Sequence, residues 1–275
     1  MAPIDEANGS NATQVQRVCH DTLPWLISVS LGFYISPSNT HHAPSQLKII
    51  MKINTAYGLA LVVGTVAAIV TMAFHPTGFD PHASVEAVAR DMSILVGVHT
   101  LALLSVPLLV FGFVGVTMRI GWHRPEALLA FIMYALSAVA IMFAGIADGL
   151  INAALIPEMT GASDLKLQAL KAALSYNFQF NQACAKVFVV GTSLAIILWS
   201  ITLFRFGVLE RRIGIIGWFI SLAALFGLLS GHVHMSAHGF GLIVLLQGVW
   251  AIALGVSMLR ANRDVAAITP GAFQV

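Results

Sequence analysis

Six long apolar stretches dominate this sequence and constrain its fold more than any other feature. They cover Ile53–Phe74, Ser93–Met118, Ala127–Ala147, Val187–Phe204, Ile213–Gly231 and Phe240–Leu259. At about 1.5 Å per helical residue, each is about long enough to cross a hydrocarbon core of roughly 30 Å. Because a bilayer interior offers peptide groups no water, such segments must be helices whose backbone groups pair internally. We therefore predict an all-α fold, a polytopic transmembrane bundle of six spans.

The composition supports a chain surrounded by lipid. Hydrophobic residues make up 58% of the chain and charged residues only 9%, against about 25% charged in soluble domains. A soluble helical bundle would need polar helix faces, which five of these six stretches lack. The net charge of +2 and the lack of a basic run argue against nucleic acid as a partner. Cys19 and Cys184 are the only cysteines, so a disulfide framework is not expected.

The distribution of basic residues predicts the orientation in the membrane. With a cytoplasmic N-terminus, only Arg90, Lys166 and Lys171 fall in outer loops. The inner helix ends are flanked by Lys48, Lys52, Arg119, Arg124, Arg205, Arg211, Arg212, Arg260 and Arg263. The positive-inside rule then places both termini in the cytoplasm, which predicts a multi-pass protein of the inner (plasma) membrane. Trp122, Trp199 and Trp218 lie near inner helix ends and are expected to be interfacial anchors.

The chain is divided into a tail, a membrane domain and a second tail. Residues 1–50 are rich in small polar residues and are expected to be a disordered tail, or an extension upstream of a natural start at Met51. Residues 51–260 form the six-helix membrane domain, and residues 261–275 form a C-terminal tail. In the second outer loop, Ser163 is expected to cap a short separate helix that lies at the membrane surface.

Ionisable residues within the spans gather at one depth on the predicted outer side. An ionisable side chain in hydrocarbon costs roughly 2.5–3.5 kcal/mol on insertion scales, so such residues are candidates for function. His99, Asp148, Asn152, Gln182 and Lys186 are our candidates for a polar pocket that binds a ligand. The alternative is a structural lock between helices, in which Asp148 pairs with Lys186.

A second cluster lies between the last two spans, where three histidines fall within seven residues. His234 and His238 are four residues apart and share a helix face if the backbone there is helical. Together with His99 and Asp148 they would form a zinc site with three histidines and one carboxylate. A solvated loop is the alternative. A haem site would instead use His99 and one of His232, His234 and His238 as axial ligands.

The set of His99, Asp148, His234 and His238 resembles the zinc-dependent intramembrane hydrolases that include alkaline ceramidases and adiponectin-receptor-like proteins. The resemblance implies a zinc-bound water that attacks a lipid amide or ester. The chain departs from that family in having six spans rather than seven, and in carrying Leu95 where the family has a serine. In architecture alone, the chain resembles six-helix membrane proteins that are widespread in bacteria.

Three functions remain open from the sequence. The first is a membrane protein with an outer pocket that binds a ligand or a metal ion, without an assigned reaction or catalytic residue. The second is a zinc-dependent intramembrane lipid amidase or esterase, and the third is a haem-binding redox protein. Zinc and haem are thus the two candidate cofactors, the lipid bilayer is the expected partner, and the oligomeric state is left open.

Overall fold

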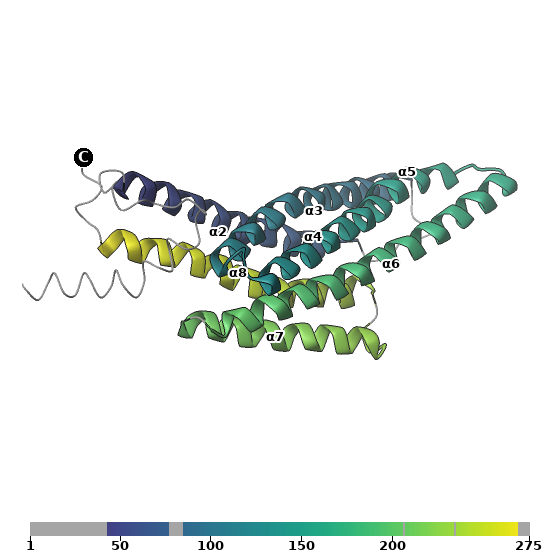
Figure 1. The fold of residues 1–275 in the computed structure, drawn as a ribbon. Helices are drawn as coiled ribbons and strands as arrows, with labels where there is room; N and C mark the ends of the chain where they lie inside the picture. Colours follow the sequence, from purple (N-terminus) through teal and green to yellow (C-terminus); the bar gives the residue numbers. More distant parts are fainter. Residues whose placement is uncertain (1–42, 77–84, 206, 234, 269–275) are drawn as a thin grey trace, which may run out of the picture.

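The structure is a computed structural model that describes residues 43–76, 85–205, 207–233 and 235–268, and within this part all regular secondary structure is helical. Six long helices are joined by short connections (Figure 1). The elements are α2 (Ala43–Ala73), α3 (Val85–Ile120), α4 (Pro125–Gly145), η2 (Ile146–Ile151), α5 (Asn152–Leu155), η3 (Pro157–Met159), α6 (Asp164–Leu203), α7 (Val208–Leu229) and α8 (Ala237–Ile268). The predicted all-α fold class is confirmed.

All six predicted spans are present as helices that are long and apolar enough to cross a membrane. Their exposed surfaces carry large hydrophobic side chains such as Leu104, Leu136 and Phe226, as expected of helices that face lipid. The chain is therefore a multi-pass membrane protein.

The prediction of a separate short helix after Ser163 is wrong. Ser163 does occupy the N-cap position, with extended backbone. The helix that follows is α6, which continues without a break for 40 residues into the fourth span. At about 1.5 Å per residue it is about 60 Å long, twice the thickness of a bilayer core. The residues assigned to a surface helix are instead the first turns of a long helix that extends beyond the membrane.

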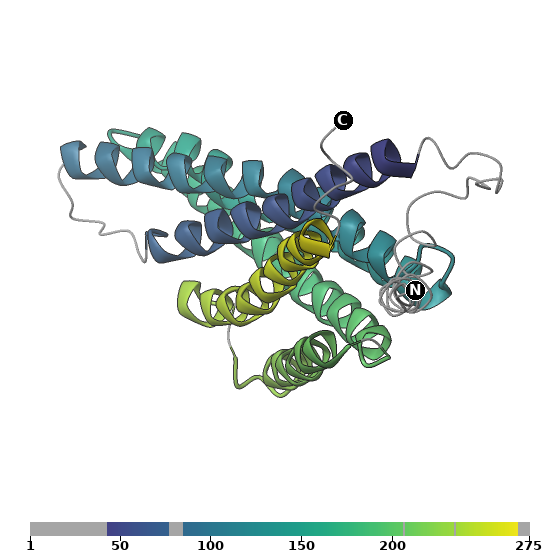
Figure 2. The same ribbon diagram turned by 90° about the vertical axis from the view of Figure 1, so that its left-hand side faces the viewer.

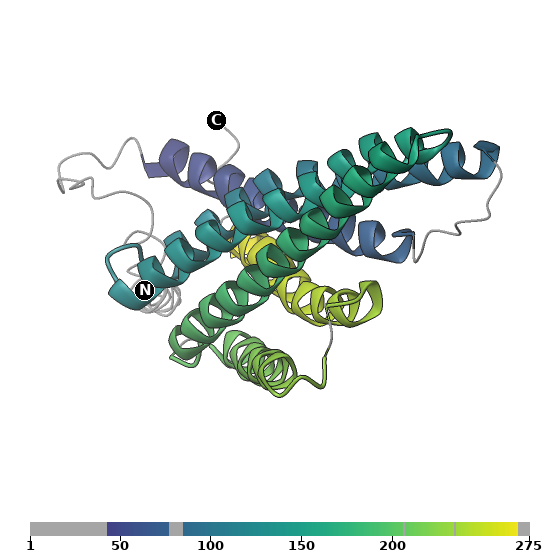
Figure 3. The ribbon, with the colours of Figure 1, turned by 90° about the vertical axis from the view of Figure 1, so that its right-hand side faces the viewer.

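The six long helices form a closed ring. In sequence order each packs against the next, from α2 through α3, α4, α6 and α7 to α8, and α8 returns to pack along α2. Figures 2 and 3 show the helices crossing obliquely, with α7 at one margin of the bundle. α2 begins at Ala43, within the segment assigned to the N-terminal tail, and α8 continues to Ile268. Residues 1–42 and 269–275 lie outside the described part of the chain.

Aromatic side chains fill one half of the ring. Phe113 of α3 stacks on Trp199 of α6 with ring centroids 4.7 Å apart and an interplanar angle of 6°. Trp250 of α8 and Tyr134 of α4 complete the cluster. Such rings bury large areas and dominate packing energy. Because Trp199 is fully buried and donates its indole N–H to Thr117 Oγ1, the prediction that it is an interfacial anchor is wrong.

Beyond this aromatic cluster, the same end of the bundle is closed by an ion pair. Arg119 near the end of α3 and Glu210 near the start of α7 are 2.8 Å apart. Trp122 and Trp218 are partly exposed near this end. A small cavity of about 10 Å³ lies beside this ion pair, and a much larger cavity lies in the other half of the ring.

Candidate metal centre

The other half of the ring contains a partly open cavity of about 710 Å³. Most of its lining is apolar and comes from α2, α3, α4, α6 and α8 and from the turn between α7 and α8, with Tyr134 among the lining residues. Of the five predicted pocket residues, His99, Asp148, Gln182 and Lys186 line this cavity. Asn152 lies next to it, hydrogen-bonded to Asp148.

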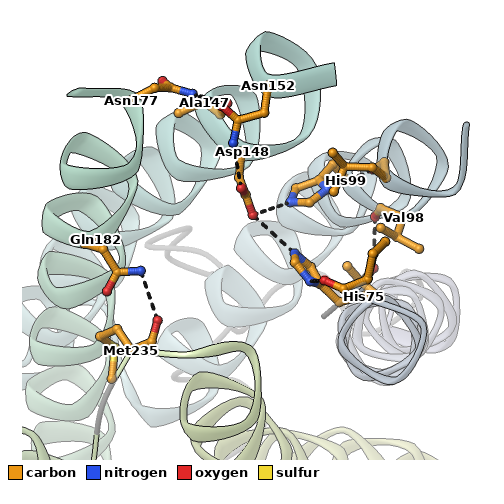
Figure 4. A network of polar contacts seen from close by, with 12 residues as sticks. His75, Val98, His99, Ala147, Asp148, Asn152, Asn177, Gln182 and Met235 are labelled. Carbon is orange, nitrogen blue, oxygen red and sulfur yellow. Dashed lines mark hydrogen bonds and ion pairs between the residues drawn. The ribbon is translucent and has the colours of Figure 1, made fainter. Parts of the chain in front are cut away.

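Three potential metal ligands converge on one wall of the cavity (Figure 4). Asp148 Oδ2 lies 3.2 Å from His75 Nε2 and 3.4 Å from His99 Nε2. All three ligand atoms are within 4.8 Å of one another. His99 is buried, and His75 and Asp148 are partly buried. The three residues come from different helical segments, so the cluster depends on the packing of the ring.

Each of the three side chains is positioned by a local feature of the chain. His75 follows the end of α2 and precedes Pro76, and His99 lies within α3. Asp148 lies in η2, a π-helical turn that continues α4. π-Helical turns are rare within α-helices and are frequent at functional sites, because the extra residue redirects the side chains around it.

A close contact between α3 and η2 determines the position of His99. Gly149 follows Asp148, and a Cβ atom at Gly149 would overlap the Cβ and Cγ atoms of His99. The pair Gly145 and Gly149 resembles the small-residue motifs that let membrane helices approach closely. In this protein, the absent side chain at Gly149 makes room for an imidazole.

Backbone hydrogen bonds fix the tautomers of the two imidazoles. His75 Nδ1 lies 2.9 Å from the Pro76 carbonyl oxygen, and His99 Nδ1 lies 2.8 Å from the Leu95 carbonyl oxygen. A carbonyl oxygen only accepts hydrogen bonds, so we assign the proton of each neutral ring to Nδ1. Both Nε2 atoms then present lone pairs toward the Asp148 carboxylate. This is the arrangement of metal-binding histidines, whose second nitrogen donates to a carbonyl.

A chain of amides orients the carboxylate. Asn177 of α6 donates from Nδ2 to Asn152 Oδ1 at 2.6 Å and is also 2.6 Å from the Ala147 carbonyl oxygen. Asn152 therefore turns its own Nδ2 toward Asp148 and donates to Oδ1 at 3.0 Å. This leaves Oδ2 of Asp148 free to face the two histidines. Second-shell bonds of this kind orient metal ligands.

The distances in the cluster match those of a small metal ion. In a tetrahedral site with bonds of roughly 2.0–2.1 Å, neighbouring ligand atoms are about 3.3 Å apart. Two of the three separations in the cluster, 3.2 and 3.4 Å from Asp148 Oδ2, bracket this value, and the third is within 4.8 Å. Without a metal, a proton must reduce the repulsion between facing lone pairs. Consistent with this, the hydrogen bond to Asp148 raises the pKa of His75, although burial of the ring opposes the shift.

The structure separates the remaining candidates from this cluster. Lys186 and Gln182 line the cavity from α6, and Gln182 donates to the Met235 carbonyl oxygen at 3.0 Å. Among the ion pairs of the described residues, Asp148 has the two histidines as partners and not Lys186. The alternative in which Asp148 pairs with Lys186 is therefore wrong. The carboxylate oxygens of Asp148 contact His75, His99 and Asn152 instead.

The described histidines after α7 do not take part in the cluster. His234 lies outside the described residues. His238 is exposed and does not belong to the cluster of ligand atoms. His232 is exposed as well, with Nδ1 2.8 Å from Ser230 Oγ. Of the predicted zinc ligands that the structure describes, only His99 and Asp148 are close together, and the third ligand is a residue outside the predicted set.

That residue is His75, which the sequence-based site did not include. Its position at the end of the first span puts it at the same depth as His99 and Asp148, and this was the signal available in the sequence. Several polar residues share that depth, however, and only the ring order of the helices shows which of them meet.

Comparison of the chain with models of known families, with curated proteins and with solved structures finds no match.

Proposed function

We propose that this membrane protein binds one divalent transition-metal ion through His75 Nε2, His99 Nε2 and Asp148 Oδ2. The observation that carries the proposal is the convergence of three electron-pair donors within 4.8 Å of one another, with both Nδ1 atoms and the second carboxylate oxygen already bonded elsewhere. Two imidazoles and a carboxylate suit zinc, and also suit non-haem iron. We infer zinc, since the two separations from Asp148 Oδ2, 3.2 and 3.4 Å, suit a four-coordinate site.

A zinc-dependent hydrolysis of lipid-like amides or esters is the reaction that this site supports best. Catalytic zinc sites have three protein ligands and a fourth position for water. The three residues of this cluster line a largely apolar cavity, which would hold an acyl chain next to that fourth position. A bound metal would lower the pKa of water to about 7 and so supply a nucleophile.

The geometry favours a metal ion over haem. A bis-histidine haem needs two imidazoles on opposite faces of the macrocycle. His75 and His99 instead have ring centroids 5.0 Å apart and direct both Nε2 atoms at the same carboxylate oxygen. A porphyrin plane between them would collide with Asp148.

The test of this function is the metal content of the purified protein, measured for zinc, iron, manganese and copper. We expect about one zinc per chain, and loss of it in the His75→Ala and His99→Ala variants because each removes one of three ligands. The same preparations are assayed for cleavage of a fluorogenic long-chain amide and ester, which should occur only with metal bound.

His238→Ala is the matched control, since His238 is an exposed histidine outside the cluster. It should retain the metal and the activity of the parent protein. Equal metal content in all four proteins would refute the site. Normal metal content without cleavage of either substrate would leave the metal site standing and refute the hydrolase.

We further propose that both termini are cytoplasmic and that the metal centre lies near the outer face of the inner (plasma) membrane. Arg119, Arg205, Arg211 and Arg212 gather at the helix ends on the opposite side of the bundle from His75, as the positive-inside rule requires. Reporter fusions after residues 122 and 207 should be active in the cytoplasm, and a fusion after residue 161 outside it. The reverse pattern would overturn the orientation.

A further inference from the structure

Lys186 has no role in the proposed metal centre, although it is a cation in the wall of the same cavity. Among the described residues it takes part in no ion pair. It lies on α6, immediately before the apolar stretch Val187–Phe204, and its side chain is exposed where it lines the cavity. A lysine at the edge of a membrane span normally faces a partner, water or a water-filled cavity. An unpaired ammonium group at a cavity wall therefore indicates a ligand that brings its own negative charge.

The rest of the cavity indicates what else that ligand carries. Next to Lys186 in the sequence, the wall includes Ala185 and Phe188, and α3 and α4 contribute Val106, Leu109 and Ala138 to it. These side chains offer no hydrogen bonds, so they suit a hydrocarbon chain. The volume of about 710 Å³ falls within the range of roughly 300–1,000 Å³ that is typical of small-molecule sites.

Gln182 adds a polar group beside the ammonium. It lies one helical turn before Lys186 and so shares its face of α6. Its Nε2 donates to the Met235 carbonyl oxygen, which fixes the amide on the wall facing the metal centre (Figure 4). The polar groups of α6 are thus grouped together, while the apolar lining continues toward Tyr134.

We propose that the cavity binds a single-chain amphiphile with an anionic head, a carboxylate or a phosphate monoester, whose head pairs with Lys186 and whose acyl chain fills the apolar lining. The inference goes beyond the metal centre, since it rests on a cation of α6 rather than on the ligands from α2, α3 and η2. It names the chemical class of molecule that would reach the proposed zinc.

The experiment measures binding of hexadecanoate, hexadecyl phosphate and hexadecanol to the full chain in lipid nanodiscs, with empty nanodiscs as the correction for partitioning. We expect saturable 1:1 binding of at least one anionic probe, about tenfold or more tighter than the alcohol, because bonds to charged groups are worth more than neutral ones. The anionic probe that binds with the higher affinity identifies the head group as a carboxylate or a phosphate. If neither anion binds more tightly than hexadecanol, the proposal is overturned.

Lys186→Met tests the cation, because it removes the charge and retains the unbranched side chain. It should bind the anion and hexadecanol about equally. Lys171 is a lysine on the same helix that does not line the cavity, so Lys171→Met should keep the preference for the anion over hexadecanol. Shortening the probe should weaken binding by about fourfold per methylene if the chain is buried. Loss of this chain-length dependence in Ala138→Phe, which fills the cavity, would agree with the proposal.

The His75→Ala/His99→Ala double variant separates this inference from the metal site. If it loses metal and retains the Lys186-dependent preference for the anion, both proposals stand. If the parent protein contains no metal yet shows that preference, the metal centre fails and the ligand site stands. If the preference depends on the two histidines and is unchanged in Lys186→Met, the head group binds at the metal, and the assignment to Lys186 is overturned.

Discussion

Asp148→Asn is expected to abolish stoichiometric metal binding. The substitution preserves the size of the side chain but removes the only carboxylate of the cluster. Loss of an outer hydrogen bond to a ligand alone reduces metal affinity by about 10–100-fold, so we expect loss of the ligand itself to reduce the affinity for zinc by about 100-fold or more.

The neighbouring amides make this variant more informative than a loss of charge alone. Asn177 fixes Asn152, and Asn152 points its Nδ2 at Oδ1 of residue 148. An asparagine at 148 must then turn its own oxygen toward Asn152. Its NH₂ group takes the place of Oδ2 and faces the two imidazoles as a donor. A metal ligand is replaced by a group that cannot bind a metal.

Competition titration with a chromophoric chelator measures this loss, and circular dichroism checks that the fold is retained. Asn152→Ala serves as the graded comparison. It leaves all three ligands in place but removes the bond to Oδ1, and changes of this kind typically reduce metal affinity by about 10–100-fold. Unchanged affinity in Asp148→Asn would exclude Asp148 as a ligand.

Gly149→Ala is expected to disrupt the cluster without altering any ligand. The new methyl group would occupy the space of His99 Cβ and Cγ. Either the imidazole leaves its position or α3 separates from η2. Overpacking of this kind costs about 1–3 kcal/mol, and we expect loss of metal together with a lower melting temperature.

Gly145→Ala is the matched control, one turn earlier on the same segment. There the added Cβ would lie 3.5 Å from Leu103 Cδ2 and 3.9 Å from His99 Cδ2, which is ordinary van der Waals contact. This variant should retain the metal and gain up to about 1 kcal/mol from the helical preference of alanine over glycine. Thermal unfolding followed by tryptophan fluorescence distinguishes the two variants. Equal stability and equal metal content would show that the contact between Gly149 and His99 is unimportant.

The number and type of the helices could be predicted from the sequence because they follow from local properties. A run of about twenty apolar residues has one favourable environment, the hydrocarbon core, and one backbone structure that satisfies its peptide groups there. Neither property depends on the rest of the chain. Where the local signal was weak, the prediction was wrong: the first turns of α6 are less apolar than the span that follows, and they were taken for a separate helix.

The burial of Trp199 illustrates a different limit. A tryptophan near the end of a span is typical of an interfacial anchor, but the ring of helices buries Trp199 against Phe113 and Trp250. The sequence gives the position of a residue along a helix. It does not give the direction that the residue faces when all neighbours are apolar, since lipid and protein interior are then equally suitable.

The candidate metal centre was partly accessible from sequence. His99 and Asp148 were identified because ionisable groups in a span are costly and few. The third ligand could not be identified, because the sequence offers His75, His234, His238 and Lys186 at similar depth. Only the packing of α2 against α3, together with the π-helical turn that directs Asp148 toward them, selects His75. Hydropathy alone determined that this chain is a membrane protein with six helical spans, because hydrophobicity acts residue by residue; the tertiary structure decided which polar atoms meet, because their meeting depends on helix order and on one unusual turn.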